Sequence, residues 1–230
     1  MDRPGRRPFV RGSAATARPE CQNAKPMTTQ EDTRLAPVPF AEWDEETRIT
    51  LLAHLRRSEL YLSGAPDAPP MPIVLELFAH HVPLSETFLT FTDVLAGNQA
   101  RLAPRIRELL ILRVAWRTGS GYEWNQHRRM GAEEGLTDAQ IRAVREGPNA
   151  AVWTPLERAL LAAVDEMADD FAISEKSWDE LAASFDEPQL FELLFVVGGY
   201  VCLAGVLNSL GLRGEIPEEP AETGEKGAAP

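Results

Sequence analysis

The chain has 230 residues, of which 44% are hydrophobic and 25% are charged, and this composition is typical of a soluble globular domain. Its 23 Lys and Arg are outnumbered by 35 Asp and Glu, which gives a net charge of -12 and disfavours general nucleic-acid binding. The two cysteines, Cys21 and Cys202, are too few for a disulfide framework, so we expect a cytoplasmic protein.

The two ends of the chain differ in composition from its middle. Residues 1–26 carry six basic and two acidic side chains among many Pro, Gly, Ala and Ser residues, which is typical of disorder. We therefore predict a disordered basic segment over residues 1–39, with Met27 as an alternative start. A second disordered tail, which is acidic, is predicted over residues 215–230. Residues 40–214 remain as the one predicted domain.

The middle of the chain has the apolar periodicity of helices, and no run alternates strictly between apolar and polar residues as a strand does. Pro and Gly residues separate the helical segments from one another. We predict an all-α bundle with helices at Trp43–Leu62, Pro72–His80, Leu84–Gly97, Pro104–Arg117, Gly121–Glu134, a short segment from Thr137, Pro155–Asp170, Ser174–Ser184 and Glu187–Leu212.

The last predicted helix contains 20 residues without a charge, Leu193–Leu212, which is long enough to span a bilayer. The run also contains Asn208, Ser209 and four glycines, and no basic cluster flanks it. A helix that is apolar all round is equally suited to a protein core or a subunit interface. We expect a buried or interface helix and no membrane association.

One glutamate lies in the middle of an apolar helix face. At 100° per residue, Glu108 falls between Ile111 and Leu112 on the segment that begins at Pro104. A carboxyl group in that place tends toward a raised pKa, which makes Glu108 a candidate acid or base. The alternative is a buried ion pair with Arg101 or Arg105, each about one turn away.

The following helix opens with Ser120-Gly-Tyr-Glu123, the pattern of a capping box in which Glu123 bonds back to the Ser120 amide. Glu123 and His127 are four residues apart and therefore share a helix face. A glutamate bonded to a histidine fixes the tautomer of the ring and raises its basicity, as in a general base with its orienting group. The spacing leaves both interpretations open.

Glu108, Glu123 and His127 together would also suit Zn, Mn or Fe. The Glu-x-x-x-His spacing alone is a weak signal, however, and we predict no metal site. Tyr122 and Trp124 flank Glu123 and are candidates either for the wall of a substrate pocket or for ordinary packing.

The order of these motifs resembles the carboxymuconolactone decarboxylase family, whose superfamily includes the alkylhydroperoxidase D-like proteins. The resemblance covers about residues 40–214. It is carried by Arg-x-Arg-Glu-Leu-x-x-Leu-Arg from Arg105, Tyr-Glu-Trp-x-x-His from Tyr122 and Glu-x-Gly-Leu-Thr from Glu133. It implies a compact all-α bundle that forms homo-oligomers, trimers or hexamers, with sites near the subunit contacts.

The peroxidase branch of that family carries Cys-x-x-Cys-x-x-x-His, and counting back from His127 places its cysteines at Ser120 and Glu123. Neither side chain supplies the sulfur that attacks a peroxide. The decarboxylase branch keeps a histidine without the cysteine pair and uses neither a metal nor an organic cofactor. The resemblance therefore favours decarboxylase chemistry over peroxidase chemistry in this chain.

We accordingly expect a cofactor-free acid/base enzyme that decarboxylates or isomerises a small carboxylated lactone or a related organic acid. His127 is predicted as the general acid or base, Glu123 as its orienting group and Glu108 as a second acid or base. Ser120, Tyr122 and Trp124 are predicted to line the substrate pocket. The alternatives are a non-catalytic oligomeric scaffold that binds a ligand or partner, and a residual peroxidase that depends on Cys202.

Overall fold

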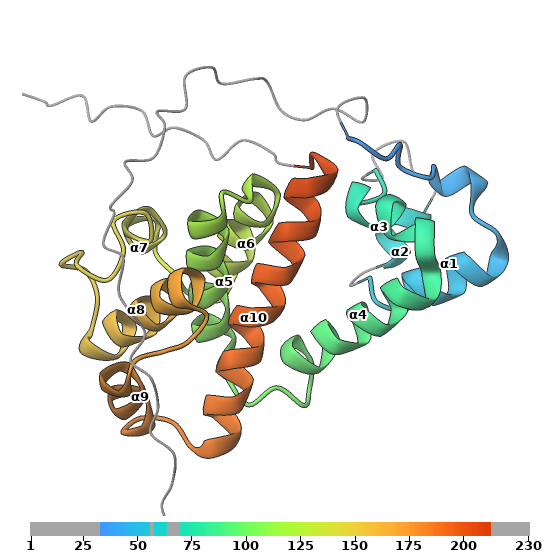
Figure 1. The fold of residues 1–230 in the computed structure, drawn as a ribbon. Helices are drawn as coiled ribbons and strands as arrows, with labels where there is room; N and C mark the ends of the chain where they lie inside the picture. Colours follow the sequence, from blue (N-terminus) through green and yellow to red (C-terminus); the bar gives the residue numbers. More distant parts are fainter. Residues whose placement is uncertain (1–32, 56–57, 64–69, 213–230) are drawn as a thin grey trace, which may run out of the picture.

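The structure, a computed structural model, describes residues 33–55, 58–63 and 70–212, and these residues form helices and no strand (Figure 1). The predicted all-α class is therefore confirmed. The helices are α1 (Glu45–Leu52), α2 (Ser58–Leu62), α3 (Ile73–Phe78), α4 (Val82–Ala96), α5 (Pro104–Thr118), α6 (Gly121–Glu133), α7 (Asp138–Ala143), α8 (Pro155–Asp170), α9 (Glu175–Ala182) and α10 (Glu187–Leu210), with 3-10 turns at Phe40–Glu42 and Ala79–His81.

The predicted terminal tails lie outside the described residues, except for positions 33–39. There the backbone joins the helical domain: the Arg34 N–H donates to the Leu210 carbonyl at 2.7 Å, and the Val38 N–H donates to the Glu76 carbonyl at 3.0 Å. This short stretch therefore links the end of α10 to α3.

Local sequence signals set several helix boundaries. Thr154 caps α8 in a capping box with Glu157, and Asp186 caps α10 in the same way with Gln189. Both helices also begin with a proline in their first turn, where the missing N–H is not needed. Gly119, at φ 67°, ends α5 in the left-handed conformation that glycine adopts without steric cost.

The predicted helix Trp43–Leu62 is wrong in its length, because the chain forms two shorter helices, α1 and α2, in its place. His54 lies two residues after the end of α1, and its Nδ1 lies 2.6 Å from Asp93 Oδ2 on α4. This contact ties the end of α1 to a distant helix, and local helix propensity gives no sign of it.

The centre of the fold is α5. Nine consecutive residues of this helix, Arg107–Ala115, are buried, so it is covered on all sides and not along one stripe. It packs against α6, α8 and α10, which surround it in Figure 1, while α1 to α4 form a separate group beside α10. Any polar side chain in the middle of α5 is consequently removed from water.

One side of α10 packs against α5, and the rest of its surface is only partly covered, by contacts with α4, α8 and α9. Leu193, Val197 and Leu207 are buried, whereas Phe191 is 65% exposed and Phe195 is 45% exposed. By length and composition this is the one helix in the described part of the chain that could cross a membrane, and 39% of its most apolar window is buried in the protein. The expected burial therefore holds for one side of the helix.

Candidate active site

A tight turn and a small residue bring α5 and α6 close together. Only Gly119 and Ser120 separate the two helices, and the Ser120 N–H donates to the Ala115 carbonyl at 2.9 Å. Farther along α6, a Cβ added at Gly131 would lie 2.9 Å from Leu136 Cδ1 and 3.6 Å from Glu108 Cβ. Glycine at this position therefore allows the approach that places α6 side chains against Glu108.

The closest polar contact between these helices joins Glu108 and His127. His127 Nδ1 lies 2.7 Å from Glu108 Oε2, and Arg107 Nε lies 3.3 Å from Glu108 Oε1. Glu108 is fully buried and His127 is 8% exposed. Because an ionised carboxylate only accepts hydrogen bonds, we assign the proton to Nδ1. Nε2 is then the ring nitrogen that can accept a proton.

Glu123 lies on the same face of α6 and is 2% exposed. Its two carboxyl oxygens and the buried hydroxyl of Ser120 form no hydrogen bond of normal geometry within the described residues. Burial raises the pKa of Glu123 to about 8, although the neighbouring Ser120 hydroxyl works in the opposite direction. Near pH 7 this side chain is therefore mostly a neutral acid that can donate a proton.

Tyr200 of α10 completes the cluster. Its ring meets the imidazole of His127 edge to face, with centroids 5.1 Å apart and planes at 88°. Burial raises the pKa of Tyr200, and the nearby carboxyl groups of Glu108 and Glu123 raise it further. The hydroxyl group consequently stays protonated. Sequence analysis missed Tyr200; the available signal was one aromatic hydroxyl within the charge-free run of the last helix.

The carboxyl group that contacts His127 in the structure is that of Glu108, and not that of Glu123, which was predicted as the orienting group. The close packing of α5 on α6 brings Glu108 to Nδ1 of His127, and spacing along α6 alone cannot reveal this contact. The capping box, the other interpretation of this spacing, is not formed, since the Ser120 side chain makes no capping hydrogen bond. Glu108 does form a buried ion pair, but with Arg107 and with neither Arg101 nor Arg105, the two partners considered; Arg105 pairs with Glu157 at 2.6 Å.

The three residues predicted to line a pocket lie in different surroundings. Ser120 is buried beside Glu123. Tyr122 packs against an apolar cluster that includes Leu207, and Trp124 packs against Trp116 in a tilted arrangement with ring centroids 5.9 Å apart. The structure thus joins Ser120 to the acid/base cluster and gives Tyr122 and Trp124 packing contacts elsewhere.

Within the ranges that the structure describes, no three or more His, Cys, Asp or Glu side chains are grouped so that they could hold a metal ion. Cys202 of α10 is exposed and forms no disulfide. The titratable groups of this cluster are a histidine, two carboxyl groups and a phenol, and groups of this kind can transfer protons.

Comparisons with known proteins agree with this fold. Residues 83–166 match the sequence profile of the Carboxymuconolactone decarboxylase family. An uncharacterized peroxidase-related protein from Silicibacter is 17% identical with a TM-score of 0.65, over 84% of this chain and 95% of that one. An alkylhydroperoxidase AhpD core protein from Ralstonia eutropha is also 17% identical with a TM-score of 0.65, over 80% of this chain and 93% of that one.

A third similar structure is the debrominase Bmp8, in a cysteine-to-alanine variant bound to 2,3,4-tribromopyrrole. It is 15% identical with a TM-score of 0.60, over 81% of this chain and 94% of that one. At these identities the likeness concerns the fold alone. No curated protein matches the sequence at a significant level.

Proposed function

We propose that this chain is a cofactor-free acid/base enzyme. Its residues 83–166 match the carboxymuconolactone decarboxylase family, and its described domain has the AhpD-like fold. The proposed substrate is a small carboxylated lactone or a related organic acid, and the proposed reaction is decarboxylation. The observation that carries this proposal is the buried pair of Glu108 and His127 next to a carboxyl group, Glu123, that is mostly neutral near pH 7.

The proposed reaction starts with the carboxylate of a substrate that has a conjugated carbonyl group. As the C–C bond to the carboxylate breaks, CO2 leaves and the electron pair moves into the carbonyl group to form an enolate. Donors such as the Tyr200 hydroxyl and a protonated His127 stabilise the negative charge on the enolate oxygen. The neutral carboxyl group of Glu123 then donates a proton to the carbon that has lost CO2. Water later returns a proton to the Glu123 carboxylate.

Each proposed role follows from the surroundings of the side chain. Glu108, held by Arg107, fixes the tautomer and the orientation of the His127 ring. Glu123 lacks such a partner, and its burial gives it a pKa close to the working pH of a general acid. Isomerisation, which moves one proton between two carbons, would use the same groups, and the product mass distinguishes it from decarboxylation.

Two further observations support this class of reaction. The positions that carry cysteines in the peroxidase branch are Ser120 and Glu123 here, so thiol-based reduction of a peroxide has no sulfur at those positions. The debrominase of similar fold is bound to 2,3,4-tribromopyrrole, a small planar ring, and rings of that size are what we propose for this chain.

We also propose that the chain forms a homo-oligomer through the exposed part of α10. Phe191 and Phe195 are exposed there, and their rings pack on each other with centroids 4.8 Å apart. Exposed apolar patches of this kind mark interaction surfaces. Sedimentation of the wild type and of Phe195→Glu tests the proposal: the variant should sediment as a smaller species, and an unchanged species would contradict this interface.

The test of the activity is a substrate screen by mass spectrometry, without added metal, over carboxylated lactones, β-keto acids and hydroperoxides. Wild type, His127→Ala and the control His81→Ala, an exposed histidine outside the cluster, are compared. The wild type and the control should lose CO2 from one substrate class, and His127→Ala should be slower by about 10²-fold or more. Equal rates in wild type and His127→Ala would refute the role of His127.

A further inference from the structure

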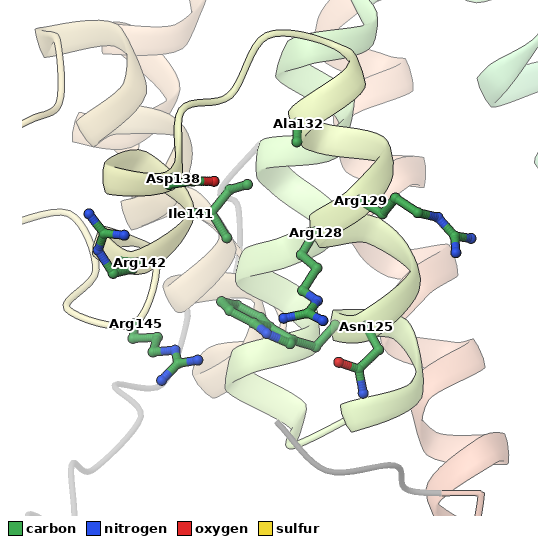
Figure 2. Close-up of a pocket in the computed structure, with 9 residues that line it drawn as sticks. Asn125, Arg128, Arg129, Ala132, Asp138, Ile141, Arg142 and Arg145 are labelled. Atoms are coloured by element: carbon green, nitrogen blue, oxygen red, sulfur yellow. The ribbon is translucent and has the colours of Figure 1, made fainter. Parts of the chain in front are cut away.

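We propose that a groove between α6 and α7 binds a small organic anion with at least two acidic groups (Figure 2). The cavity measures about 410 Å³, and small-molecule sites range from about 300 to about 1,000 Å³. Its lining includes four arginines, Arg128, Arg129, Arg142 and Arg145, and one acidic residue, Asp138. In a chain with a net charge of -12, this is a local concentration of positive charge.

Aromatic stacking holds one of these arginines in place. The Arg145 guanidinium lies 5.2 Å from the ring centroid of Trp124 and 5.5 Å from that of Trp116. Trp124 is buried and also lines the groove. A guanidinium stacked on aromatic rings loses little further freedom when it binds an anion, which favours affinity.

The backbone of Arg145 is also fixed from inside the protein. Arg113 Nη1 donates to the Val144 carbonyl at 2.5 Å and to the Arg145 carbonyl at 3.3 Å. Arg113 is itself held by Asp165 through two hydrogen bonds of 2.7 Å. The segment that presents Arg145 is therefore tied to the buried centre of α5 and α8, and this wall of the groove is rigid before any ligand binds.

The opposite wall is formed by α6. Figure 2 shows Arg128 extending from α6 into the groove, with Arg145 on the segment that follows α7. A planar guanidinium binds a carboxylate or phosphate through two parallel hydrogen bonds, so two arginines on opposite walls suit a ligand with two such groups. The ligand class is therefore a di- or tricarboxylate or a phosphate ester.

This groove is separate from the candidate active site. Glu108, Glu123 and His127 do not line it, and it uses the neighbouring face of α6, on which Trp124, Arg128 and Ala132 follow one another at intervals of four residues. The inference therefore holds whether or not the acid/base activity is confirmed. The acidic charge of the whole chain favours a small anion over a nucleic acid.

Titration calorimetry of the full chain at low salt tests the inference, with citrate and inorganic pyrophosphate as the two probes. At least one probe should bind saturably, and the tighter one identifies carboxylate or phosphate as the preferred group. Arg128→Ala should weaken that binding about tenfold, which is the loss expected for a charge-assisted hydrogen bond. Arg145→Lys keeps the charge, loses the planar stack and should also weaken binding.

The control is Arg101→Ala, which removes the same charge from an exposed position outside the groove. It should leave the dissociation constant unchanged within about twofold, because screened surface charges contribute little. Circular dichroism establishes that each variant is folded. The inference is overturned if neither probe binds, if Arg101→Ala weakens binding as much as Arg128→Ala does, or if a single-stranded oligonucleotide displaces both probes at lower concentration.

Discussion

The functional side chains on two faces of the same helix, α6, differ in their exposure to solvent. Glu123 and His127 lie four residues apart on one face and are 2% and 8% exposed. Trp124 and Arg128 have the same spacing one residue further on, and Arg128 is exposed at the edge of an open groove. On the first face burial raises the pKa of a carboxyl group to about 8, whereas on the second the guanidinium stays in contact with solvent.

The difference shows that the neighbouring helix decides what a polar side chain can do. On the buried face α5 supplies Glu108 to His127, and burial raises the pKa of Glu123. On the open face the guanidinium groups keep their charge. Their positions then decide whether an anion binds. Substitution of Glu123 should therefore affect stability and its pH dependence, and substitution of the exposed Arg128 should affect binding alone.

The largest effect is expected for Glu108→Ala, which removes the carboxylate between Arg107 and His127. Breaking a buried charged pair typically costs about 3–5 kcal/mol, because the remaining group is left without a partner. Urea denaturation should show a loss of unfolding free energy of that size. The control Glu133→Ala removes an exposed carboxyl from α6 and should cost far less. A loss of under about 1 kcal/mol for Glu108→Ala would argue against a tightly coupled pair.

The second effect concerns pH. The pKa of Glu123 rises on folding from an ordinary value of 4.5 to about 8, so between these values the folded state binds more protons than the unfolded state. Its contribution to stability is complete below pH 4.5 and is lost as the pH rises toward 8. Glu123 should therefore make the free energy of unfolding fall with pH, by about 1.4 kcal/mol per pH unit at the steepest point. Glu123→Gln should remove this slope.

The matched variant for this measurement is Glu166→Gln, for which the expected change in the pH dependence of stability has the opposite sign. Although partial burial works against it, hydrogen bonds from Ser174 and Ser177 lower the pKa of Glu166. This carboxylate therefore adds stability above its unfolded pKa and loses it in acid. Denaturation curves from pH 4 to 9 should separate the two variants. The same pH dependence in Glu123→Gln and wild type would show that Glu123 is ionised in the folded protein.

The same contrast explains how much of this molecule could be predicted. The boundaries of α8, predicted as Pro155–Asp170, are correct because a capping threonine and a proline define its start locally. The division between α1 and α2 was not predicted, and the contact of His54 with Asp93 of α4, just after α1, has no signal in the local sequence. Signals within one helix are present in the sequence, whereas contacts between helices are not.

The candidate site follows the same rule. Burial of Glu108 could be predicted from its place on an apolar face, and the shared face of Glu123 and His127 from their spacing. Which carboxyl bonds the imidazole depends on how α5 packs on α6, and the contribution of Tyr200 depends on how α10 crosses them. These contacts join distant parts of the chain and require the structure.

A smaller effect is expected for Gly147→Ala, at the point where the buried interior supports the open groove. Gly147 has φ 83°, and an added Cβ would lie 2.5 Å from Arg113 Nη2. The left-handed backbone and the clash together should cost about 1–3 kcal/mol in thermal denaturation. The control Gly205→Ala adds a methyl group in open space on α10 and should stabilise the helix slightly. Equal effects of both variants would refute the proposed support of the groove by Arg113.

The smallest effect on stability is expected for Arg128→Ala. This side chain is exposed, and removal of an exposed side chain typically changes the free energy of unfolding by no more than about 0.5 kcal/mol. The same variant should bind the anion about tenfold more weakly, so calorimetry and urea denaturation of one protein sample separate binding from folding. If Arg128→Ala instead destabilised the fold as strongly as Glu108→Ala, Arg128 would be part of the packed interior. The groove would then be no open surface for a ligand, and the contrast between the two faces of α6 would fail.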